Sequence, residues 1–393
     1  MPAVNRDTVE EFWTVDILRE CRKDAEHVSP DDFLAQLGMF LGTSGKFWPA
    51  TSARAALLSV LRATARSGKS AVLACSFNCQ VVADAILQAG GTVETYDLAD
   101  HTGRIDWHGL AAELKPHHNA LIIPHLFGVP ADFRPIQAAA ARLGIWIVED
   151  CAPTLGGQIG DAMAGTVGDA AVFSFNYDKP ISLGGGGALL VNNPDLWRQI
   201  QVPQQKVILA DEEKELDAFV AYLAARRSRL ASPPLTMAMR IMRGIKSRLL
   251  PGKTTTAFPC SGIGPLRAAL GIWQLQRYPQ IVAQRNANAN FFADRSACRS
   301  WHVAPTVRPA WLRQKLIPTD TASARQIAYR LQQQGIRVGL FNWPITLEGY
   351  LGRAEKPFAH YVAQHALDVP IHQKMTQAEL VYIHEVICSE AVA

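Results

Sequence analysis

Residues 144–193 read GIWIVEDCAPTLGGQIGDAMAGTVGDAAVFSFNYDKPISLGGGGALLVNN, and this stretch decides the fold. It holds three short apolar runs of strand length, each bounded by glycine or by polar residues. The run IWIV, and the run LIIP at residues 121–124, lack the alternation of a strand with one wet face. We therefore expect their strands to be covered on both faces, as in a mostly parallel sheet.

The segments before this stretch alternate between helical and strand patterns. The first helix has Ser52 as a plausible N-cap and a basic end closed by Gly68. The expected helices are residues 51–69, 81–91 and 135–144, and the expected strands are residues 70–76, 92–98 and 119–128. This alternation predicts an α/β fold, with a three-layer domain built on a mostly parallel sheet.

The strand signals stop after residue 193, and residues 194–258 carry helical patterns with many basic side chains. The basic residues are Arg226, Arg227, Arg229, Arg240, Arg243, Lys246, Arg248 and Lys253. A solvated helical face explains such a stretch, as does a groove for an anionic substrate. A contact with a membrane surface is the third and least favoured interpretation.

Strand and helix patterns return from about residue 259. A long helical pattern covers residues 264–294, and a helix followed by a strand covers residues 325–341. The chain therefore divides into four expected segments. These are an N-terminal helical segment (1–50), a large domain (51–193), a basic helical insertion (194–258) and a small C-terminal α/β domain (259–393).

Length and composition agree with two packed units. The chain has 393 residues and a mass of 43.0 kDa, which is longer than one hydrophobic core usually grows. Hydrophobic residues make up 48% and charged residues 19%, so the apolar material suffices for a buried core. The net charge of +4 is too small for a dedicated nucleic-acid-binding protein.

Cysteine spacing and the N-terminus bear on the compartment. The seven cysteines are widely spread and include no CxxC pair, which argues against a disulfide framework and against a zinc site. Asp7, Glu10 and Glu11 stand where a signal peptide would need an apolar run, and no apolar stretch reaches about 18 residues. We therefore expect a reduced, cytoplasmic protein.

Three polar residues at predicted strand ends are candidates for chemistry. Asp150 follows one apolar strand, and Ser174 and Lys179 follow the next. In open α/β sheets, ligands bind outside the carboxyl ends of the strands, so these residues can face one crevice. The glycines at 184–187 precede a strand, which argues against a dinucleotide fingerprint but lets backbone approach a bound group. The start of the helix at Ser52 suits a phosphate.

The order of these segments resembles the DegT/DnrJ/StrS family of sugar aminotransferases, which have the fold type I pyridoxal-phosphate architecture. The resemblance runs from about residue 51 to near the C-terminus. The segments that carry it are TSARAAL, VVADAILQAGGTVETYDL, PHLFGVPADFRPI, IVEDCAPTLGG, SFNYDKPISLGGGGALLVNN, LRAALGIWQLQRY and ALDVPIH. It implies pyridoxal 5'-phosphate as cofactor and a homodimer, because in this fold the cofactor lies at the subunit boundary.

The resemblance also implies roles for particular residues. Lys179 would form the Schiff base with the cofactor and move the proton between the substrate carbon and the cofactor. Asp150 would pair with the pyridine nitrogen. Ser174, with the backbone of Ala53 and Arg54, would hold the phosphate.

Three positions depart from the family pattern. Pro153 stands where glutamine or histidine commonly lies over the cofactor, and it offers no side-chain hydrogen bond. The aromatic residue that stacks on the ring corresponds to Cys79, or to Phe77 if the chain shifts by two residues. The segment CSGIG at 260–264 stands where an asparagine and an arginine usually reach the partner subunit's cofactor.

These observations predict an aminotransferase that moves an amino group from glutamate or glutamine to a keto sugar or a similar cyclic ketone. The keto sugar can be nucleotide-linked, and the substrate is expected to be anionic or sugar-like. One alternative is another pyridoxal-phosphate reaction on the same scaffold, such as dehydration, decarboxylation or condensation. The other is a regulatory protein that binds the cofactor but has little turnover.

Several further residues have a structural explanation beside a functional one. His125 lies near the cofactor if it follows the family, and a hydrogen-bonded core histidine is the alternative. We expect Cys151 to pack in the core and His117 and His118 to bind no metal. Asp178 either tunes the pKa of Lys179 or points to solvent.

Overall fold

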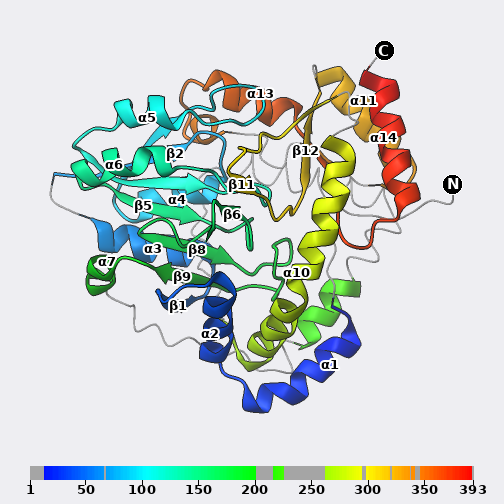
Figure 1. Cartoon of the computed structure of the whole chain (residues 1–393), viewed down its shortest axis with the longest axis horizontal. Helices are drawn as coiled ribbons and strands as arrows, with labels where there is room; N and C mark the ends of the chain where they lie inside the picture. Colours follow the sequence, from blue (N-terminus) through cyan, green and yellow to red (C-terminus); the bar gives the residue numbers. More distant parts are fainter. Residues whose placement is uncertain are drawn as a thin grey trace.

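The computed structural model describes residues 13–65, 68–200, 216–224, 262–293, 298–318, 321–336, 338–340 and 346–391. It shows an α/β molecule with a large sheet in one half and a smaller sheet in the other (Figure 1). The long helix α10 (Pro265–Ala293) runs along both halves, and it packs against α1 and α2 at one end and α14 at the other. The predicted fold class is confirmed.

The large sheet has seven strands in the order β1-β9-β8-β5-β4-β2-β3. Its strands are β1 (Lys46–Ala50), β2 (Ala71–Cys75), β3 (Thr92–Tyr96), β4 (His118–Pro124), β5 (Trp146–Asp150), β8 (Ala170–Ser174) and β9 (Gly187–Val191). The strands from β3 to β8 are parallel, whereas β9 is antiparallel to β8 and to β1. The carboxyl ends of the parallel strands therefore meet along one edge.

Helices cover both faces of this sheet, as the apolar runs predict. They are α3 (Ala53–Thr64), α4 (Gln80–Gln88), α5 (Trp107–Glu113) and α6 (Arg134–Leu143). Every residue of β4 and β5 is buried, and successive residues pack into different clusters. Ile122 packs with residues of α3 and α4, whereas Ile123 packs with residues of α5 and α6. Burial on both faces explains why these strands carry no polar alternation.

The helix α3 begins as predicted and ends earlier. The Ser52 hydroxyl accepts a hydrogen bond from the Ala55 N–H, so Ser52 is the N-cap. The helix ends at Thr64, because Ala65 leaves helical geometry with φ −57° and ψ 128°. Gly68 therefore lies beyond the helix and does not cap it.

The N-terminal segment holds helices and also one strand of the large sheet. The helices are α1 (Val15–Asp24), the short 3-10 helix η1 (Ala25–His27) and α2 (Pro30–Leu41). The strand is β1, which pairs with β9 from Lys46 to Ala50. The expected boundary at residue 51 thus falls after the first strand of the large sheet. Pro49 weakens the strand pattern here, and an edge strand tolerates a proline.

The smaller sheet lies in the C-terminal half and is antiparallel. It consists of β10 (Arg299–Ser300), β12 (Gln314–Ile317), β14 (Leu367–Val369) and β13 (Gly339–Leu340) in that order. Its helices are α11 (Thr321–Gln333), α12 (Leu347–Tyr350), α13 (Pro357–His365) and α14 (Gln377–Ala391). A third small sheet joins β11 (Val307–Arg308) to β6 (Gln158–Ile159) and β7 (Ala162–Met163). It links the two halves because β11 and β6 belong to different halves.

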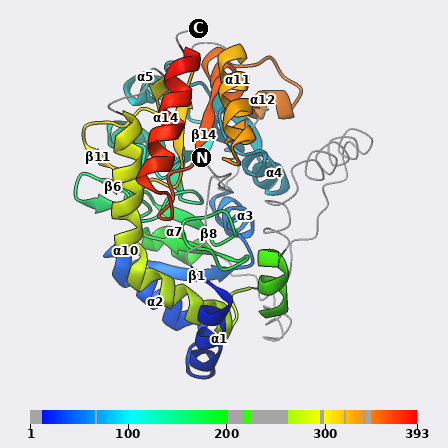
Figure 2. The ribbon, with the colours of Figure 1, turned by 90° about the vertical axis from the view of Figure 1, so that its right-hand side faces the viewer.

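Two helices of the expected insertion are described, α7 (Pro194–Gln199) and a helix over residues 216–224. The second lies near α1 (Figure 2), and its Phe219 is buried against Trp13 with 5.2 Å between the ring centroids. The eight basic residues named for the insertion lie outside the described residues. The interpretations of that basic stretch therefore stay predictions.

Candidate active site

A cavity of about 460 Å³ opens at the carboxyl edge of the large sheet, beside the ends of β5 and β8. It brings together all the predicted site residues except Phe77. Those that line it are Ala53, Arg54, Cys79, Asp150, Pro153, Ser174 and Lys179. Residues from separate elements of the sheet therefore surround one space, as their positions at strand and helix ends predict.

The connection between β2 and α4 places Cys79 at the cavity and Phe77 in the core. Phe77 is 2% exposed, and its ring centroid lies 5.8 Å from Trp301 and 6.2 Å from Phe127. Cys79 precedes the first residue of α4 and lines the cavity. Burial is the main cause that raises the pKa of the Cys79 thiol, so the side chain is a neutral thiol at physiological pH.

One wall of the cavity is formed by backbone and has the features of an anion site. The first turn of α3 opens into it, and the first N–H groups of a helix have no partner within the helix. Ser52, the N-cap, forms an isolated bridge with Gly186. A Cβ on Gly187 would lie 2.5 Å from the Ala53 nitrogen, so only glycine permits this approach of β9 to α3. Ser174 ends β8 and faces Gly187 in register.

Asp150 is the last residue of β5, and it is 9% exposed. Its Oδ1 accepts a hydrogen bond of 3.1 Å from the Ala152 N–H. Burial raises the pKa of this carboxyl, while that hydrogen bond and the charge of Lys179 act against the rise. A cationic group placed against Asp150 would keep it ionised, because opposite charges favour each other's charged form.

Lys179 lies in the turn that follows β8, and its backbone N–H donates to the Asn176 carbonyl at 3.1 Å. The Lys179 side chain is 22% exposed, and its Nζ lies 3.5 Å from Oδ2 of Asp178. The Asp178 side chain is half exposed, at 49%. Partial desolvation acts to raise the pKa of Asp178, but the charges of Lys179 and Arg313 outweigh it and lower the pKa. Asp178 is therefore an ionised partner of Lys179.

Asn78 is a cavity residue that the sequence did not single out. It is 1% exposed, and its Oδ1 accepts a hydrogen bond of 2.7 Å from the Cys79 N–H. Its Nδ2 has no hydrogen-bond partner among the described residues. A buried donor without a partner costs about 1–3 kcal/mol, which a ligand oxygen would remove. The position of an amide three residues after the end of β2 was the available signal.

His125 is a hydrogen-bonded core histidine. Its Nδ1 accepts a hydrogen bond of 2.9 Å from the Ala131 N–H, so its Nε2 carries the proton. That Nε2 donates to Glu149 at 2.7 Å, and both side chains are fully buried. Glu149 also accepts from the N–H groups of Gly165, Val167 and Gly168. The predicted packing role of Cys151 agrees with its burial at 2% exposure.

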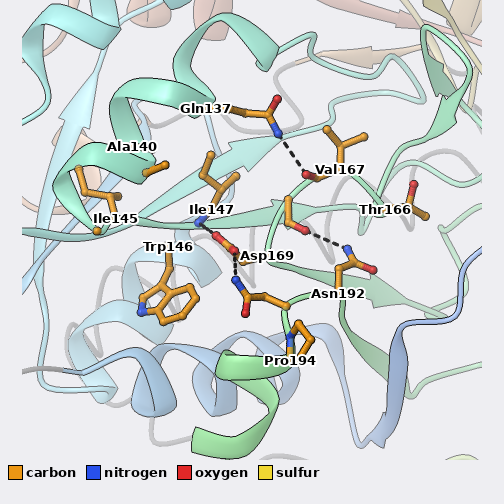
Figure 3. Close-up of a pocket in the computed structure, with 14 residues that line it drawn as sticks. Gln137, Ala140, Ile145, Trp146, Ile147, Thr166, Val167, Asp169, Asn192 and Pro194 are labelled. Atoms are coloured by element: carbon orange, nitrogen blue, oxygen red, sulfur yellow. Dashed lines mark hydrogen bonds between the residues drawn. The ribbon is translucent and has the colours of Figure 1, made fainter.

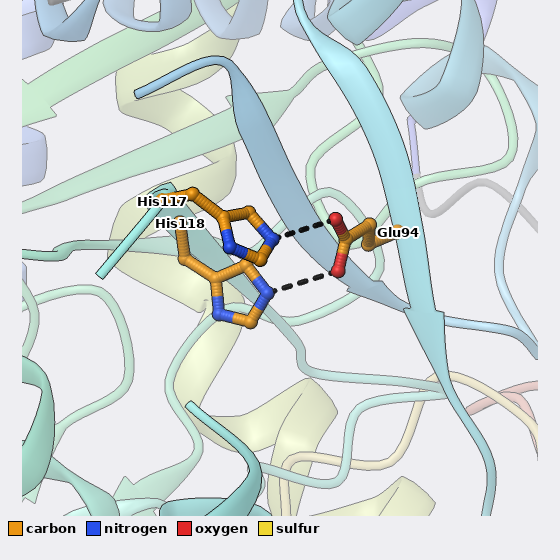
Figure 4. Close-up of side chains that lie close together, drawn as sticks. All are labelled: Glu94, His117 and His118. Atoms are coloured by element: carbon orange, nitrogen blue, oxygen red, sulfur yellow. Dashed lines mark hydrogen bonds and ion pairs between the residues drawn. The ribbon is translucent and has the colours of Figure 1, made fainter. Parts of the chain in front are cut away.

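The side chains of His117 and His118 both bond to Glu94 on β3, which is separated from β4 by β2 (Figure 4). Their Nε2 atoms lie 2.8 and 3.0 Å from the Glu94 carboxylate oxygens. The Lys115 N–H donates to Nδ1 of His118 at 3.1 Å, so the proton of His118 is on Nε2. That nitrogen therefore has no lone pair for a metal in the neutral ring. The expected absence of a metal stays a prediction.

A larger cavity, of about 610 Å³, lies at the opposite edge of the sheet (Figure 3). Asp169 accepts hydrogen bonds there from the Ile147 N–H and from Nδ2 of Asn193. Nδ2 of Asn192 donates to two backbone carbonyls, and Gln137 donates to the Val167 carbonyl. These side chains hold the turns together, and the described residues that line this cavity include no lysine or cysteine nucleophile. The smaller cavity is therefore the candidate active site.

Residues 30–227, half of the chain, match the model of the DegT/DnrJ/EryC1/StrS aminotransferase family. One similar curated protein is the UDP-N-acetyl-3-dehydro-alpha-D-glucosamine 3-aminotransferase of Acidithiobacillus ferrooxidans. It is 34% identical over 37% of this chain and 40% of its own length. The L-glutamine:2-deoxy-scyllo-inosose aminotransferase of Streptoalloteichus tenebrarius is 28% identical over 39% of this chain and 36% of its own. The matches thus span about two fifths of these relatives.

Solved structures extend the similarity in fold to the whole chain. Helicobacter pylori PseC, an aminotransferase involved in the biosynthesis of pseudoaminic acid, has a TM-score of 0.76 at 15% identity. That match covers 99% of this chain and all of PseC. The sugar aminotransferase CalS13 of Micromonospora echinospora has a TM-score of 0.72 at 19% identity, over 97% and 98% of the two chains. On the family match and this shared fold, the chain belongs to the DegT/DnrJ/EryC1/StrS aminotransferase family.

Proposed function

We propose that this protein is a pyridoxal-phosphate-dependent aminotransferase that moves an amino group from glutamate or glutamine to a keto sugar or a similar cyclic ketone. One observation carries the proposal. A single cavity holds a lysine amine, a buried carboxylate and an anion site made from the start of α3. Family membership and the names of the similar proteins, which are sugar and cyclitol aminotransferases, support the substrate class.

The residues of the cavity fit pyridoxal phosphate. Ala53, Arg54 and Ser174 would hold the phosphate, and Asp150 would face the pyridine nitrogen. Lys179 would bind the aldehyde carbon covalently. The unpartnered Nδ2 of Asn78 is a donor for an oxygen of the bound group. A putative sugar aminotransferase of Streptococcus pneumoniae with the same fold, at a TM-score of 0.74, is known in PLP and PMP forms.

The chemistry depends on what the protein side chains do around the cofactor. When bound, the cofactor supplies an electron sink that acidifies the substrate's carbon–hydrogen bond. Nζ of Lys179 would move the proton between the substrate carbon and the cofactor, because Lys179 supplies an amine to the same cavity. Asp150 supplies the negative charge that keeps a pyridinium protonated. Pro153 adds no hydrogen bond to the cavity wall.

The first experiment is spectroscopic. Purified protein with pyridoxal phosphate should absorb in the violet, and Lys179→Ala should lose this band. Lys46→Ala, which removes an exposed lysine on β1, is the matched control and should keep it. A wild-type protein that stays colourless with added cofactor would contradict the proposal.

The second experiment decides which reaction is catalysed. Glutamate or glutamine should convert the bound cofactor to its amine form, and a keto sugar should restore the violet band. If no amino donor changes the spectrum, the result favours the alternatives. Release of water or carbon dioxide would identify dehydration or decarboxylation, and a joined product would identify condensation. A coloured protein with no turnover of any kind would favour a regulatory role.

We also propose a homodimer in the cytoplasm. The fold supports a dimer, because closed two-fold pairs are the commonest assembly and the fold places the cofactor at the subunit boundary. Light scattering should give twice the mass of one chain. Cys21, Cys75, Cys79 and Cys151 form no disulfide, which supports a reducing compartment. No helix in the described part of the chain is both long and apolar enough to cross a membrane.

The four segments expected from the sequence stay part of the proposal. The segment 51–193 supplies most of the cavity wall, and the segment 259–393 packs against it through α10 and β11. An anionic substrate group is the ligand that we propose for the basic insertion, residues 194–258. The residues at 260–261, part of the departure from the family pattern, lie outside the described residues.

A further inference from the structure

A network of charged side chains connects the small sheet to Lys179. Nζ of Lys315 lies 2.5 Å from Oδ1 of Asp368, and Nη1 of Arg313 lies 3.7 Å from Oδ2 of the same carboxylate. The other end of the guanidinium, Nη2, lies 3.3 Å from Oδ2 of Asp178. That same oxygen is 3.5 Å from Nζ of Lys179. The Asp178 carboxylate thus lies between the Arg313 guanidinium and the Lys179 amine.

At the Arg313 end of this network, buried partners and backbone hydrogen bonds hold the side chain in place. Lys315 and Asp368 are 1% and 0% exposed, on the paired strands β12 and β14. The N–H groups of Leu312 and Arg313 donate to the Phe127 carbonyl at 2.9 and 3.3 Å. Phe127 is a non-glycine residue with a φ of 61°, a conformation that such bonds help to hold. The guanidinium is therefore presented to Asp178 from a rigid support.

Arg313 contacts Asp178 at two atoms. Asp178 is half exposed, and Arg313 donates to both its carboxylate and its backbone carbonyl, at 3.3 and 3.5 Å. An unpaired carboxylate beside Lys179 would favour the ammonium form, which is not a nucleophile. A cation on the far side of that carboxylate offsets this effect. It also holds the carboxylate at one place beside the amine.

We propose that Arg313 is a positioning residue for Lys179, which acts through Asp178 to hold the turn and to balance the charge beside the amine. The inference rests on the proposed function, in which Lys179 is the reacting group. Other titratable or charged groups also act at this cavity. Asp150 at the end of β5, Cys79 before α4, and Arg54 on α3 belong to the same electrostatic neighbourhood. They are unchanged in the variants below and serve as a constant background.

The test measures, in the protein without cofactor, the fraction of the Lys179 amine that is neutral at each pH. Trace acetic anhydride labels neutral amines only, and mass spectrometry of the Lys179 peptide gives the labelled fraction at each pH. Arg313→Met should raise the midpoint of this curve by about half to one pH unit, because the carboxylate then favours the ammonium. Asp178→Asn should lower the midpoint by a similar amount.

The double variant separates a positioning role from a direct one. If Arg313 acts through Asp178, Arg313→Met should shift the midpoint far less when Asp178→Asn is already present. Equal shifts in the two backgrounds, or none in either, would overturn the proposal. Asp178→Asn alone provides a test on a half-exposed residue if Arg313→Met does not fold. Arg313→Lys, which keeps the charge, should restore part of the wild-type curve.

The chain contains a matched control pair. Arg308 on β11 and Asp161 form an exposed ion pair with the same 3.3 Å separation between Nη2 and a carboxylate oxygen. Arg308→Met should leave the Lys179 curve unchanged, and an equal shift in it would overturn the proposal. Failure of the proposed function is recognised separately. In that case wild-type protein shows no violet band with pyridoxal phosphate, whatever the labelling curves show.

Discussion

The buried position of Asp150 suits a cationic ligand but lowers the stability of the protein without cofactor. Burial raises its pKa, so ionising this carboxyl at neutral pH weakens the folded state without cofactor. The pKa of Asp150 is higher in the folded state than in the unfolded state. The stability from this group is therefore present below the unfolded-state pKa and is lost as the pH rises through the folded-state pKa. A cationic ring nitrogen in the cavity would remove the penalty.

Asp150→Asn should therefore separate stability from activity. We expect the cofactor-free variant to melt at a higher temperature than the wild type at neutral pH, with no difference at a pH below the ordinary carboxyl range. We expect turnover with cofactor to fall by about 100-fold or more. Asp169→Asn, at the opposite edge of the sheet, is the control and should lower stability without changing turnover of the folded protein. Equal turnover in wild type and Asp150→Asn would refute the assignment.

At the scale of elements, the anion site depends on how closely β9 approaches α3. A Cβ on Gly187 would lie 2.5 Å from the Ala53 nitrogen and 2.7 Å from the Phe173 carbonyl oxygen. Gly187→Ala should lower the free energy of unfolding by about 1–3 kcal/mol and weaken cofactor binding at least tenfold. Fluorescence titration with pyridoxal phosphate measures the binding. Gly42→Ala, with a φ of 64° and no atom within 4 Å, should lower stability and leave binding unchanged.

Asp100, in the loop after β3, should make the stability of the protein depend on pH. Asp100 accepts hydrogen bonds from the N–H and hydroxyl of Thr102 and from Nε of Arg104. Desolvation acts to raise the pKa of Asp100, but these bonds and the Arg104 charge lower it to about 2. A lowered pKa stabilises the fold above the unfolded value and loses that effect as the pH falls through the folded one.

Asp100→Asn should therefore destabilise the protein at neutral pH by about 1 kcal/mol, after solvent screening of a partly exposed group. The difference from wild type should shrink between about pH 4 and pH 2, as the wild-type carboxyl is protonated. Urea unfolding at several pH values measures this. Asp16→Asn on α1, where the side chain is 85% exposed, is the control for removing a surface carboxylate. A constant difference across that pH range would contradict the assignment.

At the scale of the whole molecule, α12 joins the C-terminal half to the large sheet. Glu348 on α12 is 2% exposed and accepts hydrogen bonds from the hydroxyls of Ser76 and Thr95, at the ends of β2 and β3. The Leu347 N–H donates to the Ser76 carbonyl at 2.9 Å, and Tyr350 Oη donates to Asp84 at 2.6 Å. This contact keeps the two halves together near the carboxyl edge of the sheet.

Glu348→Ala should lower the free energy of unfolding by about 2–4 kcal/mol, because the buried Ser76 hydroxyl and the partly buried Thr95 hydroxyl lose their acceptor. Tyr350→Phe, which removes one partly buried hydrogen bond from the same helix, should cost about 1 kcal/mol. Guanidinium unfolding of both variants gives the comparison. A smaller effect for Glu348→Ala than for Tyr350→Phe would show that the contact is not a main link between the halves.

Much of the fold was predictable because its signals are local. The continuous apolar runs of β4 and β5 indicate strands covered on both faces, and Ser52 indicates the start of α3. The addition of β1 to the large sheet was not predictable. Its pairing partner β9 lies more than a hundred residues later in the sequence, and Pro49 hides the strand pattern.

The amino-acid sequence alone determined the fold class, and it placed Asp150, Ser174 and Lys179 at one edge of the sheet. Carboxyl ends of neighbouring parallel strands must meet, so position in the sequence implies position in space. Tertiary structure alone decided that Cys79 and not Phe77 lines the cavity. The Phe77 ring is buried against Trp301 instead. It also brought Arg313 to Asp178, 135 residues apart in the sequence. Such a contact depends on how separate domains pack, which no local pattern contains.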